Sequence, residues 1–293
     1  MTDTLGLQRR YFAEEIEAVG CLRTPGLVDA LATVPREQFL PPGPWKVASQ
    51  GDFQTGPRAL DALRTTPDAD PRHTYHNISV AIDPARQLFN GQPALVCSWI
   101  DMLGLGPGSR VLHIGCGLGY YAALMAHVVG EHGRVVAVEV DQELAERAAA
   151  ALAPWKPVEV RHGDGTVDLR QGAFDAILVN VGVTHPEPSW LDALSGGGRL
   201  LLPLTVSMPA MGTISKGPVL LFSNDGDPNS LAARVVGFAV IYSAVGLRDD
   251  DLNRRLGEAL KTGPFPPVKR LRRDAHDTAP QCWLHTDAFC LSA

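Results

Sequence analysis

The stretch HIGCGLGYY, His113 to Tyr121, places three glycines at alternate positions directly after the apolar run VLHI. Gly115 permits a tight turn, and Gly117 lets a ligand approach the backbone, because glycine has no side chain and tolerates unusual backbone angles. Gly119 lets the next helix begin close to the strand. A strand, a glycine turn and a helix in this order predict a site for a nucleotide-like ligand.

The spacing of these glycines narrows the choice of ligand. A dinucleotide-binding turn has the pattern G-x-G-x-x-G. Counted from Gly115, its third glycine would stand at position 120, which is tyrosine. The turn therefore suits a ligand without a pyrophosphate, and a nicotinamide oxidoreductase is the less favoured interpretation.

Short apolar runs alternate with helical stretches from Arg110 onward. The pattern predicts helices at about 118–130, 141–153 and 186–194, lying between strands at 110–114, 134–140, 157–161, 174–179 and 198–204. Apolar strands separated by helices indicate βαβ units and a buried parallel sheet, whose ligands bind at the C-terminal ends of the strands. The predicted fold class is α/β, a Rossmann-like, doubly wound and mostly parallel sheet.

The flanking segments differ from this core. Helical spacing at 5–19 and 25–33, a Pro-rich loop at 41–71 and a helix candidate ending at Gly104 predict an N-terminal cap. After Leu204 come strand-like runs, a polar helix DDDLNRRLGEAL and a final run CWLHTDAFCLS, which resemble an extension of the sheet. The predicted organisation is a helical and Pro-rich cap, a ligand-binding core and a C-terminal sheet extension, at 1–104, 105–205 and 206–293.

Two acidic residues follow neighbouring strands of the predicted sheet. Glu139 ends the second strand, 24 residues after Gly115, where a carboxylate can accept hydrogen bonds from ribose hydroxyls. Asp164, in RHGDG after the third strand, is placed to meet an adenine amino group. The glycine turn, the acidic strand end and the Asp-bearing turn, in this order, match S-adenosylmethionine-dependent methyltransferases. We expect the cofactor to contact Gly115, Cys116, Gly117, Gly119, Glu139, Val140, Asp164, Gly165 and Asn180.

Longer segments resemble one family of these enzymes. The stretches VLHIGCGLGYYAALMAHVVGEHGRVVAVEVDQELAERA, VEVRHGDGTVDL, FDAILVN and LSGGGRLLLPL are similar to protein-L-isoaspartate O-methyltransferase, and VPREQFLPP resembles its N-terminal VPRExFVP segment. The similarity is good over about residues 80–205. It implies S-adenosylmethionine as donor and a carboxylate as acceptor, in a peptide, a protein or a small molecule.

The chain departs from the family at two positions. Members carry a T-I-S-x-P segment with a Ser or Thr beside the methyl-transfer site, but the matching stretch FNGQP has Gly91 there. Asn90, one position earlier, can supply an amide in place of the hydroxyl, and we predict it as the catalytic residue. His113 replaces the acidic residue that is common just before the glycine turn.

The chemistry of the acceptor leaves two alternatives open. A carboxylate is ionised at pH 7 and needs no general base, so alignment of the reacting atoms is the main demand. Because Gly91 lacks the hydroxyl, a small-molecule methyltransferase and a non-catalytic S-adenosylmethionine-binding module remain alternatives.

Composition and charge argue against several kinds of partner and cellular location. The net charge of −6 and the even spread of Lys and Arg argue against nucleic acid and anionic membranes as partners. Five cysteines in no regular framework and no apolar leader predict reduced thiols and a cytoplasmic protein. The sequence does not indicate the oligomeric state.

The C-terminal region contains residues of the types that bind zinc. They are spaced H-x5-C-x2-H-x4-C, which follows no standard zinc finger, and CWLHTDAFC also alternates like one half-buried strand. The sequence pattern therefore predicts no metal site for His276, Cys282, His285 and Cys290.

Overall fold

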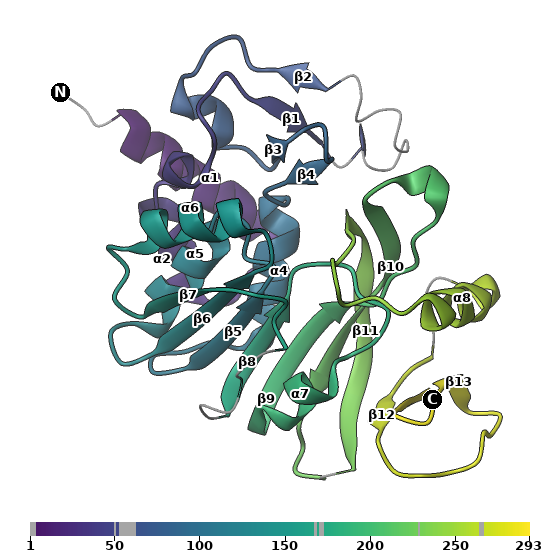
Figure 1. Cartoon of the computed structure of the whole chain (residues 1–293). Helices are drawn as coiled ribbons and strands as arrows, with labels where there is room; N and C mark the ends of the chain where they lie inside the picture. Colours follow the sequence, from purple (N-terminus) through teal and green to yellow (C-terminus); the bar gives the residue numbers. More distant parts are fainter. Residues whose placement is uncertain are drawn as a thin grey trace. The chain divides into compact units, whose positions relative to one another are not determined.

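A computed structural model describes residues 4–49, 51–52, 63–166, 169, 173–227, 229–263 and 267–293 (Figure 1). The chain forms two compact units, residues 1–163 and 164–293. The division of the sequence into a cap, a core and an extension stays a prediction.

The first unit begins with helices that follow the predicted periodicity. They are α1 (Thr4–Gly20), α2 (Pro25–Thr33) and, after an intervening segment, α4 (Pro93–Leu103). Proline is the first residue of both α2 and α4, where its missing N–H costs no helical hydrogen bond. Helix α4 ends because Gly104 adopts the left-handed conformation, with φ of 69°.

Three parallel strands form the sheet of this unit in the order β5, β6, β7. Strand β5 (Arg110–Ile114) leads into helix α5 (Tyr120–Val129), β6 (Arg134–Glu139) leads into α6 (Gln142–Leu152), and β7 (Val158–His162) follows. The predicted strands and helices of this region are confirmed to within two residues. Buried apolar side chains on β5, β6 and α5 form the core that fixes the glycine turn.

A small antiparallel sheet has two of its strands within the long loop predicted at 41–71, of which residues 50 and 53–62 lie outside the described residues. Its strands are β1 (Lys46–Ala48), β2 (Arg64–Thr65), β3 (Ser79–Asp83) and β4 (Leu88–Phe89), in the order β2-β1-β3-β4. Trp45 and Val47 pack with Leu40 and Val80 in a local apolar cluster. The sequence pattern missed these strands because they are only two to five residues long and lie among Pro and Gly residues.

The second unit contains the rest of the predicted strands and the C-terminal extension. Strands β8 (Phe174–Val179) and β9 (Leu194–Pro203) are parallel, and the short helix α7 (Pro188–Asp192) lies between them in sequence. The extension, β10 (Ile214–Ser223), β11 (Ser230–Tyr242), β12 (Arg270–Arg272), β13 (Cys282–His285) and β14 (Cys290–Ser292), is antiparallel. The polar helix α8 (Asp250–Ala259) begins at Asp249, whose side chain accepts the N–H of Leu252.

The final run is two strands and not the single half-buried strand predicted. Strands β13 and β14 pair antiparallel, and Thr286 closes the turn between them through its hydroxyl, which accepts the N–H of Phe289 at 2.8 Å. The turn reverses the chain, so residues at its two ends come together.

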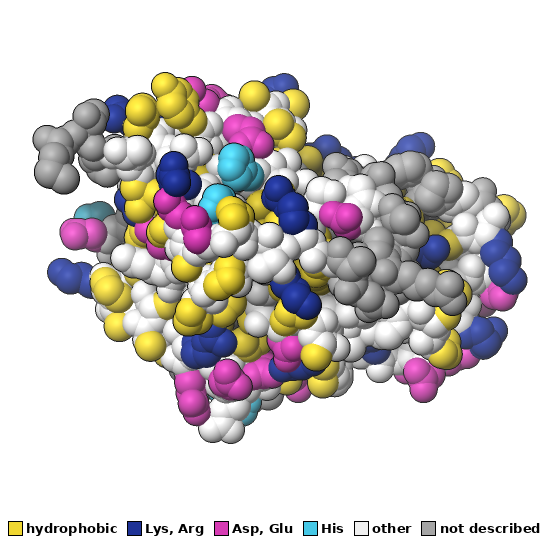
Figure 2. All heavy atoms as spheres, turned by 90° about the horizontal axis from the view of Figure 1, so that it is seen from above, with side chains coloured by type: hydrophobic (Ala, Val, Ile, Leu, Met, Phe, Trp, Pro, Cys, Tyr) yellow, Lys and Arg dark blue, Asp and Glu magenta, His cyan; other side chains and the backbone are white. Residues whose placement is uncertain are grey.

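The surface seen in Figure 2 carries both signs of charge among the coloured residues, with Lys and Arg interspersed with Asp and Glu. Among the described residues, no helix combines the length and apolarity needed to cross a membrane.

Candidate active site

The glycine turn after β5 has the backbone conformation that its sequence predicts. Gly115, Gly117 and Gly119 have φ of 72°, 56° and 93°, all in the region that favours glycine. A Cβ on Gly117 would meet only the Ile82 side chain, at 3.8 Å. The backbone at Gly117 therefore offers room for a ligand to approach.

Gly119 is needed for a different contact from the one expected. A Cβ there would lie 2.6 Å from Cδ1 of Leu152, so the absence of a side chain lets α5 begin against α6. The sequence indicated close packing at this position, but the neighbour is the second helix.

Glu139 lies beside the glycine turn, held by backbone N–H groups. Its Oε2 accepts the N–H of Gly117 at 2.8 Å, and its Oε1 accepts those of Val140 and Asp141 at 2.9 and 3.1 Å. Burial raises the pKa of the Glu139 carboxyl, and these three hydrogen bonds act in the opposite direction. A carboxylate has about four acceptor positions, so Oε2 retains one for an incoming hydroxyl.

Two more residues of the predicted cofactor set surround this carboxylate. Cys116 is buried, and burial raises the pKa of its thiol well above the usual value, so the thiol stays protonated. Val140 is a large apolar residue that is 39% exposed, next to an acidic residue that is 8% exposed. An exposed apolar side chain at this point suits the face of an aromatic base.

The hairpin of β3 and β4 packs near the glycine turn. At its tip, Nη1 of Arg86 binds Oδ2 of Asp141 at 2.7 Å, and Asp141 also caps α6 by accepting the N–H of Leu144. This ion pair ties the hairpin to the residues that follow Glu139, and Ile82 of the same hairpin lies near Gly117. Asn90 directly follows β4, so the hairpin also places Asn90 in the part of the unit that contains the glycine turn.

Asn90 has one end of its amide occupied and the other free. Its Oδ1 accepts the backbone N–H of Val80 at 2.8 Å, while its Nδ2 is buried with no hydrogen-bond partner among the described residues. A buried amide group without a partner is costly, so such a group calls for a ligand or a water molecule.

The side chain of Arg36 donates to Asn90 and helps to hold it, a role that the sequence analysis did not identify. Arg36 is completely buried in a short 3₁₀ helix, η1 (Arg36–Phe39). Its Nη2 donates to the carbonyl of Ile78 at 2.8 Å and to Oδ1 of Asn90 at 3.4 Å, and its Nη1 donates to the carbonyls of Thr74 and His76. Arg36 and Asn90 are referred to below as the Arg36–Asn90 cluster.

This cluster gives a physical reason for the VPREQF segment. The guanidinium lies 5.7 Å from the ring centre of Phe12 and 5.8 Å from that of Tyr120, so aromatic faces cover it. The oxygens that accept hydrogen bonds from this guanidinium belong to uncharged carbonyl and amide groups. The signal in the sequence was an arginine within VPREQF, the segment that resembles the family's VPRExFVP.

Gly91 has a backbone conformation that explains the missing hydroxyl. Its φ is 79°, and its carbonyl accepts the Tyr121 hydroxyl at 3.1 Å. A Cβ there would lie 3.1 Å from Val96, so a serine would be both strained and crowded. The departure from the family pattern is therefore built into the local fold.

His113 is fully buried on β5, and neither ring nitrogen has a hydrogen-bond partner among the described residues. Burial lowers its pKa to about 3, so the ring is neutral at working pH. A neutral ring can accept a hydrogen bond from an ammonium group or from a water molecule, but it cannot form an ion pair.

Three of the predicted cofactor residues belong to the second unit. Asp164 accepts the N–H and the hydroxyl of Thr166 at 2.9 and 2.8 Å, and the Gly165 carbonyl accepts the N–H of the buried Trp190 at 2.9 Å. Asn180 directly follows β8 and is half-buried. The roles of these residues toward a cofactor stay predictions.

The residues of the first unit fit an adenosyl sulfonium. Gly117 leaves room for a ligand at the backbone, Glu139 has an acceptor position that suits a ribose hydroxyl, and Val140 has an exposed apolar side chain that suits the base. The contacts of these residues with the cofactor stay predictions. In the neutral ring of His113, near the end of β5, one nitrogen is an acceptor and the other a donor, and neither has a hydrogen-bond partner among the described residues.

Comparisons with known proteins point to one family. The sequence model of "Protein-L-isoaspartate(D-aspartate) O-methyltransferase (PCMT)" matches residues 58–216, more than half of the chain. Protein-L-isoaspartate O-methyltransferase 1 of Rhodopseudomonas palustris is 35% identical over 69% of this chain and 71% of its own length. The enzyme of Methylorubrum populi is 32% identical over 81% of this chain and 98% of its own length.

Solved structures agree on the fold. A protein-L-isoaspartate O-methyltransferase aligns with a TM-score of 0.63 and 24% identity, over 89% of this chain and 72% of its own. A putative enzyme of this kind from Plasmodium falciparum, in complex with S-adenosyl-L-homocysteine, aligns with a TM-score of 0.57 and 15% identity, over 81% and 98% of the two chains. With its glycine turn, its acidic strand end and these relatives, the chain belongs to the protein-L-isoaspartate(D-aspartate) O-methyltransferase family of S-adenosylmethionine-dependent enzymes.

Proposed function

We propose that this enzyme methylates an isoaspartyl-type carboxylate of a peptide or protein, and that Asn90 replaces the usual hydroxyl residue in binding that carboxylate. The buried, unpartnered Nδ2 of Asn90 is the observation that carries the proposal. Its two N–H bonds are donors, and a carboxylate is a strong acceptor.

The orientation of the amide supports this assignment. The N–H of Val80 and Nη2 of Arg36 both donate to Oδ1, which fixes the oxygen on the protein side. The NH₂ group is therefore left for a ligand. An amide held in this way needs no reorganisation when the acceptor binds.

The charge behind the amide favours an anion. The Arg36 guanidinium is buried, and the groups that accept its hydrogen bonds are uncharged. Its positive charge therefore acts on a ligand that binds at Asn90. In a buried region this attraction is weakly screened. A carboxylate is favoured there over an amine, which would carry a positive charge itself.

The reaction makes modest demands on the protein. S-adenosylmethionine supplies an activated methyl group, and the acceptor carboxylate is already ionised at pH 7. The residues of the chain therefore bind the two substrates, align the carboxylate with the methyl group and exclude water. Asn90 orients the acceptor and Arg36 positions Asn90.

A methylation assay with matched peptides tests the proposal. The enzyme is incubated with labelled S-adenosylmethionine and a peptide containing isoaspartate, with the aspartate peptide as comparison. We expect methylation of the isoaspartyl peptide, and a loss in kcat/KM of about 10- to 100-fold in Asn90→Ala, the value of one or two charge-assisted hydrogen bonds. Affinity for S-adenosylhomocysteine should stay unchanged.

Gln92→Ala is the control, because this neighbouring amide donates to the carbonyl of Asn77 and has a partner within the chain. Unchanged kinetics in Asn90→Ala would refute the role of Asn90. Tight binding of S-adenosylhomocysteine without methylation of any carboxylate peptide would refute the enzymatic proposal and favour the non-catalytic module.

A further inference from the structure

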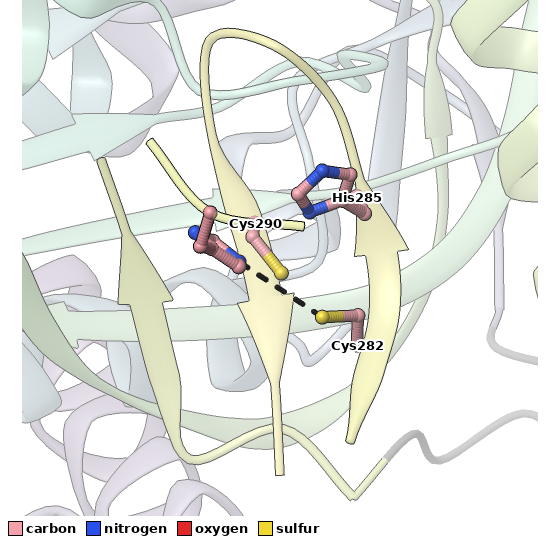
Figure 3. Close-up of side chains that lie close together, drawn as sticks. Cys282, His285 and Cys290 are labelled. Atoms are coloured by element: carbon pink, nitrogen blue, oxygen red, sulfur yellow. Dashed lines mark hydrogen bonds between the residues drawn. The ribbon is translucent and has the colours of Figure 1, made fainter. Parts of the chain in front are cut away.

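Four potential metal ligands from a segment of 15 residues come together at the C-terminal hairpin. His276 precedes β13, Cys282 and His285 are the first and last residues of β13, and Cys290 begins β14. One ligand atom from each residue lies within 4.8 Å of all the others. In Figure 3 the sulfur atoms of Cys282 and Cys290 point toward one another, and the ring of His285 lies beside them.

The spacing of these atoms is close to that of a tetrahedral zinc site. Around a zinc ion, sulfur and nitrogen ligands lie about 3.3 to 3.8 Å from one another, as follows from bonds of about 2.3 and 2.0 Å. Nε2 of His276 lies 3.9 Å from Sγ of Cys282. A contraction of about 1 Å or less brings the whole set to bonding distances.

The surroundings of the two histidines have the features of ligand positions. Nδ1 of His276 donates to the carbonyl of Asp274 at 2.8 Å, which leaves Nε2 unprotonated and directed at Cys282. Zinc-bound histidines commonly donate their other nitrogen to a carbonyl in this way. Nδ1 of His285 is buried and has no hydrogen-bond partner among the described residues, an unusual state that a metal ion would resolve.

We propose that His276, Cys282, His285 and Cys290 bind a structural zinc ion. The donor set is two sulfurs and two nitrogens, which zinc prefers over calcium or magnesium. On binding, the two thiol protons are released to solvent, and two thiolates then balance the charge of the ion. Four protein ligands leave no open position, so the site is not a catalytic one.

The zinc ion holds together a part of the chain that has little core of its own. Residues 273–281 have no helix or strand, and β12, β13 and β14 contain only three to four residues each. Buried Leu271, Leu284 and Leu291 supply a small apolar centre. A metal ion that ties His276 to the hairpin orders the irregular segment, as structural metals do in small domains.

Two thiols that lie within 4.8 Å of one another could instead form a disulfide, here between Cys282 and Cys290. Both are free in this structure. Cys282 is paired in register with Ser292, and Cys290 with His285, so the two cysteines are not opposite one another. A disulfide would remove both thiols as metal ligands and leave Nδ1 of His285 still without a hydrogen-bond partner among the described residues.

Metal analysis of the full-length protein, purified without chelator or metal-affinity tag, tests the proposal. We expect about one zinc ion per chain, released when the thiols are modified with a mercurial. Cobalt added to reduced apoprotein should give the intense visible absorption of a tetrahedral, thiolate-bound ion. Cys282→Ser with Cys290→Ser, and separately His276→Ala, should reduce bound zinc at least tenfold.

Cys21→Ser and His132→Asn are the matched controls, because both residues are exposed and lie in the first unit. They should keep the full zinc content. Titration with S-adenosylhomocysteine shows whether each variant is folded, so a failure of the zinc proposal is separate from a failure of the enzymatic one. The proposal is overturned by reduced wild-type protein that binds neither zinc nor cobalt. A Cys282–Cys290 disulfide in freshly purified protein, or zinc that persists in the double cysteine variant, also overturns it.

Discussion

The glycine turn and the Arg36–Asn90 cluster lie in the same unit, but they are built in different ways. The turn uses backbone groups: three N–H groups hold Glu139, one from Gly117 of the turn and two from the residues that directly follow Glu139. The cluster uses two side chains 54 residues apart that contact directly, and carbonyls of residues 74–78 hold the arginine. Local sequence therefore dictates the first and the tertiary fold dictates the second.

Removal of the buried arginine should have the largest effect. Arg36→Met leaves the carbonyls of Thr74 and Ile78 without their Arg36 donor, and Oδ1 of Asn90 keeps only the N–H of Val80. We expect a loss of about 3 to 5 kcal/mol in the free energy of unfolding, measured by urea denaturation. Arg10→Met, at an exposed position of α1, should change it by less than about 0.5 kcal/mol. Similar stabilities for the two variants would show that the cluster is not held by Arg36.

The two ends of α5 provide the next test. Gly119 and Gly130 both have positive φ, but a Cβ on Gly119 overlaps Leu152, whereas a Cβ on Gly130 meets nothing within 4 Å. Gly130→Ala should lower the unfolding free energy by about 1 to 2 kcal/mol through backbone strain. Gly119→Ala should cost about 1 to 3 kcal/mol more through overpacking. Equal losses would contradict the packing role of Gly119.

A smaller and more specific effect is expected at Gly117. Its positive φ makes Gly117→Ala a strained substitution, as at Gly130, but its Cβ would enter the space beside the glycine turn. Affinity for S-adenosylhomocysteine, measured by calorimetry, should fall about 10- to 100-fold in Gly117→Ala. It should change little in Gly130→Ala. An unaltered affinity in Gly117→Ala would place the ligand elsewhere.

The same contrast explains how much could be predicted from the sequence. The strand at 110–114 and the helix at 25–33 were predicted to the residue, because hydrophobic periodicity and a proline at the helix start are local signals. The strands β1 to β4 were missed, because short strands among Pro and Gly residues depend on their partners. The turn at Thr286 was missed as well, so the final run was interpreted as one strand.

The functional residues also differ in whether local sequence or the tertiary fold determines their role. Glu139 lies beside the glycine turn as its place at a strand end predicted, because parallel strands bring their C-terminal ends to one edge. Arg36 was not identified, since its role depends on carbonyls that only the fold brings to it. The spacing of the Cys and His residues at 276–290 predicted no metal site. In the fold, their ligand atoms lie within 4.8 Å of one another, because the chain reverses between β13 and β14.

The central claim is that Glu139 binds the ribose of the cofactor, and calorimetry with deoxy analogues tests it most directly. Wild-type protein should bind the 2′- or the 3′-deoxy form of S-adenosylhomocysteine about 10- to 100-fold more weakly than the parent compound, the value of a hydrogen bond to a charged group. Glu139→Gln should lose most of that discrimination, while Glu143→Gln, at an exposed acid of α6, should retain it. Equal affinity of wild-type protein for the parent compound and both analogues would contradict the account.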